Sequence, residues 1–150
     1  WSVTNAWDHE GYFQRKYGTF AGNTGGPINE LNYGTNFRII RYADVLLMAA
    51  EAAYRDGDED QARDYVNDVR TRPGTNLSEI SATGAALFDA IVLERQLELA
   101  FEGHRFVDLV RWGRASTELV TLGFSAGKHE VLPIPINEIN TSGLDQNQNY

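Results

Sequence analysis

A chain of 150 residues is long enough to bury a hydrophobic core, and its hydrophobic content of 42% favours a folded protein over a disordered one. The formal net charge of -8 argues against nucleic acid as a partner, because such binding relies on Lys and Arg clustered on one face. The absence of cysteine excludes disulfides, thiolate metal sites and cysteine nucleophiles, and the longest apolar run, residues 45–50, is far shorter than the roughly 20 residues of a membrane helix.

Residues 1–37 are rich in glycine and aromatic residues and lack a sustained helical period, which predicts loops with a short strand near residues 11–17. Trp7, Tyr12 and Tyr33 lie among glycines, where exposed rings can stack on sugar rings while nearby Asn and Asp bind the hydroxyl groups. They are therefore candidate ligand-binding residues. The alternative for any one of them is packing in the core.

Residues 38–73 are predicted to form an antiparallel helix pair. Strong helix formers fill residues 41–54, and Gly57 suits a left-handed C-terminal cap. Asp58, with Gln61 three residues later, is typical of a capping box that starts a second helix. That helix ends before Pro73, which cannot continue it.

Residues 84–115 are predicted to contain two charged helices. The first spans about residues 85–102 and breaks at Gly103, and the second is short and follows it directly. Residues 116–150 are predicted to be irregular apart from a possible helical turn near residues 136–140, since the two prolines of "VLPIP" disfavour a central strand. The expected fold class is thus mainly α, with long loops and little sheet.

The segment "ERQLELAFEGHRFVDLVRWG" concentrates acidic and basic residues among apolar ones. If the first helix continues to residue 102, its carboxylates form one stripe with apolar residues on both flanks, and neighbours are expected to cover it. Buried carboxylates must be paired, and the spacing predicts pairs of Arg95 with Glu98 and of Arg105 with Glu102. The expected structural ion-pair network consists of Glu94, Arg95, Glu98, Glu102, Arg105, Asp108 and Arg111.

A catalytic alternative exists for the same carboxylates. Glu94 and Glu98, one helical turn apart, match the roughly 5.5 Å separation of a retaining glycosidase. That chemistry needs an open cleft and one carboxyl group with a raised pKa, whereas adjacent arginines lower the pKa. The pattern therefore favours a structural role.

Other common sites have little support. The three histidines, His9, His104 and His129, lack a metal-binding spacing, and the acidic run at residues 56–60 lacks the glycine and glutamate of a calcium loop. The chain contains no "GxSxG", "GxGxxG" or phosphate-loop motif. We expect no metal and no cofactor.

Five stretches in this order resemble the C-terminal portion of the SusD/RagB family: "GYFQRKY", "RYADVLLMAAEAAYRDGDEDQARDYVNDVRTR", "ERQLELAFEGHRFVDLVRWG", "VLPIPINEI" and the closing "QNQNY". The resemblance extends over nearly the whole chain. It departs at the end, where the family has "QNPGY" and this chain has Gln148 and Asn149. The start at Trp1, with neither an initiator Met nor a signal sequence, agrees with a piece of a longer protein.

The resemblance implies a helical domain with a tetratricopeptide-like helix pair, in a non-catalytic, surface-exposed lipoprotein of the outer membrane of Bacteroidetes. Such a protein binds oligosaccharide, or in some members peptide, and passes it to a TonB-dependent transporter of SusC type. Its only link to the membrane is an N-terminal lipid anchor that this chain lacks. Two alternatives stay open: a tetratricopeptide-like scaffold for protein partners, and a glycoside hydrolase that uses Glu94 and Glu98.

Overall fold

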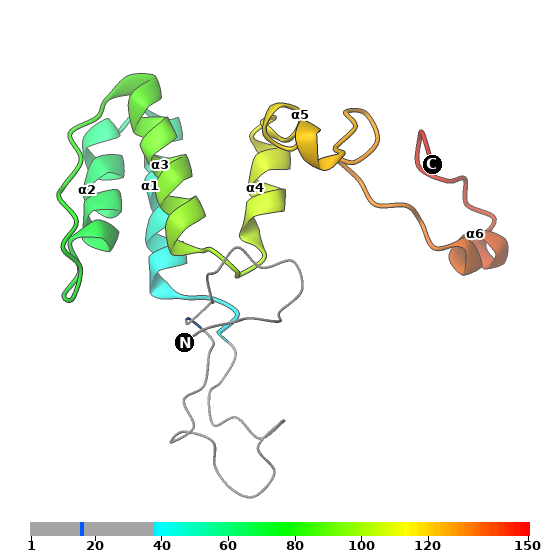
Figure 1. Ribbon diagram of the computed structural model, residues 1–150, viewed down its shortest axis with the longest axis horizontal. Helices are drawn as coiled ribbons and strands as arrows, with labels where there is room; N and C mark the ends of the chain where they lie inside the picture. Colours follow the sequence, from blue (N-terminus) through cyan, green and yellow to red (C-terminus); the bar gives the residue numbers. More distant parts are fainter. Residues whose placement is uncertain (1–15, 17–37) are drawn as a thin grey trace, which may run out of the picture.

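The computed structural model describes residue 16 and residues 38–150. Within these residues the chain forms helices and no strand, which confirms the prediction of a mainly α fold (Figure 1). The elements are α1 (Tyr42–Asp56), α2 (Glu59–Arg70), α3 (Gly84–Glu98), α4 (His104–Arg111), α5 (Ala115–Glu118), the short 3-10 helix η2 (Val120–Leu122) and α6 (Ile136–Ser142).

The first two helices form an antiparallel pair, and its turn has the chemistry that the sequence predicts. Gly57 adopts a φ of 90°, and its N–H and that of Asp58 donate to the carbonyls of Tyr54 and Ala53. The Asp58 side chain accepts a hydrogen bond from the backbone N–H of Gln61 at 3.0 Å. The pair therefore turns tightly between α1 and α2.

The core lies where α3 packs against this pair. It consists of fully or almost fully buried side chains: Leu47, Ala50, Ala62, Val66, Val69, Leu87 and Ile91. The two alanines, one on each helix of the pair, allow α1 and α2 to approach closely. Burial of this apolar surface is the main stabilising term of the three-helix body.

The connection between α2 and α3 runs back alongside α2 (Figure 1). The Asn67 amide on α2 accepts from the N–H of Ile80 at 2.8 Å and donates to its carbonyl at 3.2 Å. Arg70 donates to the carbonyl of Ser78 at 2.9 Å, and Arg63 donates to that of Ala82 at 3.1 Å. These side chains of α2 satisfy backbone groups of the loop. They hold this polar segment in one conformation along α2 although it has no regular secondary structure.

Helix α3 is shorter than the sequence predicts, because it ends at Glu98 rather than at residue 102. In a longer helix the Glu98 carbonyl would accept from the N–H of Glu102. Here it accepts from the Arg41 guanidinium at 2.8 Å and from Lys16, and Phe101 turns the chain with a φ of 65°. Glu102 and Arg105 consequently do not share a helix with Glu94 and Glu98.

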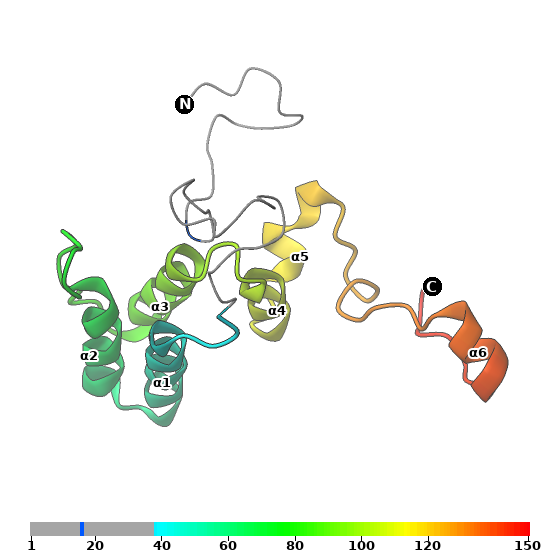
Figure 2. The ribbon, with the colours of Figure 1, turned by 90° about the horizontal axis from the view of Figure 1, so that it is seen from below.

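Beyond α4 the chain leaves the helical body. Helix α6 and the C-terminus lie at a distance from α1–α4 in both views (Figures 1 and 2), and α6 contacts no other described helix. From residue 115 to residue 150 the chain forms the short elements α5 and η2 and the helix α6, with irregular backbone between them.

Candidate functional site

The charged residues of α3 and α4 form ion pairs that join them to α1, α2 and α5. Among the most buried of them is Arg95, which is 4% exposed. The Arg95 guanidinium donates to Asp44 of α1 at 3.0 Å and to Asp108 of α4 at 2.9 Å. Both aspartates are 5% exposed, so a cation on α3 holds carboxylates from the helices on either side of it.

A second group of charges surrounds the C-terminal end of α3. Arg41 donates to Glu98 at 2.8 Å and to Glu102 at 2.9 Å, and Arg72 pairs with the other oxygen of Glu98 at 2.8 Å. Lys16 pairs with Glu102 and donates to the backbone carbonyls of Glu98 and Ala100. Cations at this position also favour the negative end of the helix dipole.

The remaining members of the network pair with other helices too. Glu94 accepts from Arg70 of α2 at 2.7 Å, and Arg105 pairs with Glu118 of α5. Arg111 binds both oxygens of Glu51 on α1. Each carboxylate or guanidinium of the predicted network therefore has a partner of opposite charge on another element.

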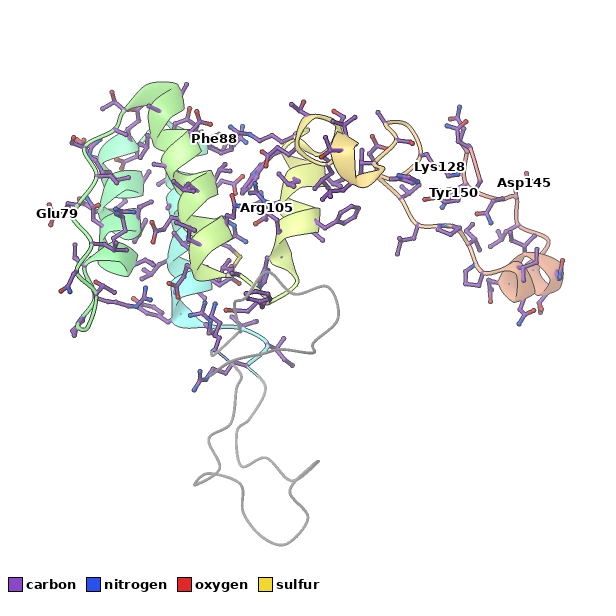
Figure 3. The ribbon with its side chains drawn as sticks, viewed as in Figure 1. Glu79, Phe88, Arg105, Lys128, Asp145 and Tyr150 are labelled. Atoms are coloured by element: carbon purple, nitrogen blue, oxygen red, sulfur yellow. The ribbon has the colours of Figure 1, made fainter. Side chains whose placement is uncertain are left out.

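The predicted pairing between residues three positions apart is wrong. Arg95 bonds Asp44 and Asp108 instead of Glu98, and Arg105 bonds Glu118 instead of Glu102, because neighbouring helices supply these partners. The structure brings Glu94, Arg95 and Glu98 together on α3 and joins Asp108 to Arg95 and to Arg111. Arg105 lies on α4 (Figure 3), where it pairs with Glu118 of α5.

The expectation of cover on both flanks of α3 is also wrong. Val92 and Leu99 are buried, but Leu93 and Leu97 on the other flank are 51% and 61% exposed. Phe101, which follows the helix, is exposed as well. The charged side chains of α3 are buried because α1, α2 and α4 cover α3, and these helices cover it on one side only.

Sequence reasoning missed seven partners: Lys16, Arg41, Asp44, Glu51, Arg70, Arg72 and Glu118. A signal was available for two of them. Arg41 and Asp44 stand just before the apolar run of residues 45–50, where a charged side chain facing the core needs a partner.

The pairing alters the acidity of two carboxyl groups. Burial raises the pKa of Glu102, but hydrogen bonds from Arg41 and Lys16 outweigh it and leave that pKa below its ordinary value. Burial also raises the pKa of Glu51, but hydrogen bonds that Arg111 and Trp112 donate to its carboxylate outweigh this effect and leave the pKa below its ordinary value. The hydrogen bond to Glu102 raises the pKa of Arg41. These groups stay charged at neutral pH.

One groove of about 480 Å³ lies at the end of the body where α1 begins and α2 and α3 end. Glu98 lines it together with Arg41 and Arg72, which hold both of its oxygens. Glu94 does not line it, and its side chain is 5% exposed. The two carboxylates thus do not face a common cleft.

The predicted ligand-binding residues Trp7, Tyr12 and Tyr33 lie outside the described residues. Among residues 16 and 38–150 no cluster of His, Asp and Glu has the arrangement of a metal site. None of the described helices combines the length and the apolar composition needed to cross a bilayer.

Comparison with known proteins gives one consistent result. A model of the SusD family matches residues 2–125. Two SusD-like proteins of Formosa agariphila, P25 and P2, are 34% and 32% identical over 74% and 90% of this chain. The matched parts make up 23% and 30% of those relatives, so the chain spans less than a third of their length.

A solved structure of a laminarin-binding SusD-like protein is also similar. It is 39% identical in sequence and superposes with a TM-score of 0.81 over 99% of this chain, which corresponds to 31% of that protein. The family match, the relatives and the shared helical fold agree with the resemblance of the sequence motifs: the chain belongs to the SusD family.

Proposed function

We propose that this chain is part of a surface glycan-binding protein that captures an oligosaccharide without cleaving it. The observation that carries the proposal is the similarity to a laminarin-binding SusD-like protein over 99% of the chain. The matched part is 31% of that protein, so binding by the whole protein is part of the proposal.

Within this chain, the candidate contacts are the rings of Trp7, Tyr12 and Tyr33. An aromatic face provides a flat apolar surface for the C–H face of a pyranose ring, and flanking polar groups bind the hydroxyls. The glycine-rich composition of residues 1–37 permits backbone turns that present such rings. A neutral glycan also suits a chain with a net charge of -8, since an anionic ligand would be repelled.

The carboxylates of α3 support a role without catalysis. A general acid needs a carboxyl group with a raised pKa and access to substrate. Glu94 is held by Arg70, and Glu98 is held by Arg41 and Arg72. Charges paired in this way brace helices, and we assign the whole network that structural role.

By the same family relation, we place the protein at the cell surface as a lipoprotein of the outer membrane. There it would pass its oligosaccharide to a TonB-dependent transporter of SusC type. Co-purification of such a transporter with the full-length protein from detergent-solubilised outer membranes tests this step. Recovery of the full-length protein in the soluble periplasmic fraction contradicts it.

Affinity gel electrophoresis with laminarin tests glycan binding directly. We expect the glycan to retard the chain, Trp7→Ala to abolish the retardation, and Trp7→Phe to keep most of it. Tyr150→Ala is the matched control, because Tyr150 lies near the C-terminus and away from the candidate contacts in sequence. Absence of retardation across neutral glycans refutes the proposal for this chain.

Two further measurements separate the alternatives. Release of reducing sugar that disappears in Glu98→Gln would establish a glycoside hydrolase. Capture of a helical peptide by the α1–α2 pair, without any glycan binding, would establish a tetratricopeptide-like scaffold; the packing of this pair around Ala50 and Ala62 is the observation that keeps this alternative open.

A further inference from the structure

The groove of about 480 Å³ at the lower end of α1–α3 in Figure 1 has the composition of a ligand site. Its volume lies within the roughly 300–1,000 Å³ of sites for small ligands. Val69 is buried and Ala43 and Leu46 are half-buried, so they provide an apolar base. A few polar groups and one exposed ring, that of Tyr42, complete the lining. Apolar surface with a few polar groups at fixed positions is what such sites have in common.

The ring of Tyr42 offers a stacking surface in this groove. Tyr42 is the first residue of α1, so the helix fixes its backbone, and the residue is 76% exposed. Exposure alone would mean little, because single apolar residues are common on protein surfaces. An exposed ring beside polar groups in a groove, however, presents a flat apolar face on which the C–H face of a pyranose ring can lie.

Two charged groups of the groove keep hydrogen-bonding capacity to spare. Asp68 and Arg72 are four positions apart, a spacing at which opposite charges usually pair on a helix. Arg72 instead bonds Glu98 at 2.8 Å and the carbonyl of Val69 at 2.9 Å, and both bonds use its Nη1. Asp68 is exposed and pairs with no cation in the part of the chain that the structure describes. The Nε and Nη2 of Arg72 and the carboxylate of Asp68 are therefore available to a ligand.

The balance of charge in the groove favours a neutral ligand. Four charged residues line it: Arg41, Arg72, Asp68 and Glu98. Their formal charges cancel, so an ionic ligand gains no net attraction and competes with the existing pairs at 2.8 Å. A hydroxyl group both donates and accepts. Neighbouring hydroxyls of one sugar can thus donate to Asp68 and accept from Arg72.

The groove also adjoins the segment that holds the proposed glycan contacts. Lys16 is the one described residue of residues 1–37. It donates to the carbonyl of Glu98, which lines the groove, and pairs with Glu102. This contact between the segment and the wall of the groove indicates that the two surfaces receive the same ligand.

We propose that the groove is a subsite for one sugar unit of a captured neutral glycan. Tyr42 stacks on the sugar ring, and Asp68 and Arg72 bind its hydroxyl groups. The inference rests on the proposed glycan binding and adds a subsite in the described part of the chain. One stacked ring and a few exposed hydrogen bonds give a weak contact, so the subsite strengthens binding without replacing the other contacts.

Calorimetric titration of the full-length protein with laminarin tests the subsite. We expect Tyr42→Ala and Asp68→Ala each to weaken binding by at least about fivefold. Tyr42→Phe keeps the ring and should stay within about twofold of the unaltered protein. Asp64→Ala is the matched control for Asp68→Ala, because Asp64 is exposed one turn earlier on α2 and does not line the groove.

The titration separates the subsite from the proposed function. If the unaltered protein binds laminarin and both Tyr42→Ala and Asp68→Ala bind it equally well, the subsite is refuted and the proposed function stands. If the unaltered protein binds neither laminarin nor any other neutral glycan, both are refuted.

Thiol protection locates the ligand independently of affinity. Pro73 lines the groove at an exposed position, so Pro73→Cys places a reactive thiol there, and Asp64→Cys places one outside it. Maleimide labelling is read on the peptide that carries the new cysteine. Saturating laminarin should slow labelling of Pro73→Cys by at least about threefold and leave Asp64→Cys unchanged. Equal rates at Pro73→Cys with and without laminarin overturn the proposal, and stronger protection by polygalacturonate than by laminarin overturns the assignment of a neutral ligand.

Discussion

Replacement of Arg95 by methionine is the sharpest test of the ion-pair network. Arg95 is 4% exposed, and it bonds two aspartates that are 5% exposed. Asp108 keeps a second bond from Arg111 at 2.9 Å, whereas Arg95 is the only cation paired with Asp44 among the described residues. Most of the cost therefore comes from one buried carboxylate left without a partner. Loss of one member of such a pair costs about 3–5 kcal/mol.

The matched control is Arg114→Met. Arg114 also joins α3 to the segment after α4, through Asp89, but that carboxylate is 62% exposed. Exposed pairs contribute less than about 1 kcal/mol, so the free energy of unfolding should change little. Adding Asp44→Asn to Arg95→Met should restore about half of the lost stability, since the unpaired charge is then removed.

Urea unfolding of the chain at neutral pH, followed by far-ultraviolet circular dichroism, measures all four proteins. The reasoning fails if Arg95→Met and Arg114→Met lower the free energy of unfolding equally. It also fails if Asp44→Asn makes the Arg95→Met variant less stable, because this outcome would mean that the carboxylate is not the source of the cost.

Three further outcomes can be measured by the same method. Gly57→Ala should cost about 1–2 kcal/mol, because a φ of 90° strains any residue with a Cβ even though no atom lies within 4 Å of one added there. Asp58→Ala should cost about 1 kcal/mol through loss of the N-terminal cap of α2. The folded-state pKa values of Glu51 and Glu102 are depressed, so the stability that they contribute is present above the unfolded pKa and is lost as the pH falls through the folded one. The free energy of unfolding should drop between about pH 5 and pH 3, and less in Glu102→Gln.

Local chemistry explains which elements the sequence could predict. The turn between α1 and α2 depends on Gly57 and Asp58, whose conformations follow from contacts within five residues. The alanines of the pair likewise indicate close helix packing without knowledge of any distant residue. The sequence motifs also indicate the SusD family, which the family match over residues 2–125 confirms.

The end of α3 could not be predicted, because it depends on residues far away in the sequence. Residues 99–102 have acceptable helix propensity, and Gly103 offered a natural stop. The helix ends at Glu98 because Arg41, 57 positions earlier, binds the Glu98 carbonyl and both nearby carboxylates. A periodic pattern identifies charges that need partners, but it does not identify partners on other helices.

The same long-range pairing explains why α3 carries its charges at successive turns. Glu94 pairs with Arg70 of α2, and Arg95 pairs with Asp44 of α1 and Asp108 of α4. Glu98 pairs with Arg41, just before α1, and with Arg72, just after α2. A buried ion pair stabilises the fold little more than apolar residues of the same size would. Its main effect is to select one arrangement of the helices, because other arrangements would leave buried charges without partners. Apolar packing holds α3 on the α1–α2 pair around Ile91 and Leu87, whereas α4 has less contact with α3 and is positioned by Asp108. Substitution of core leucines should therefore lower stability while the helices keep their order, and substitution of Arg95 should also release the orientation of α4.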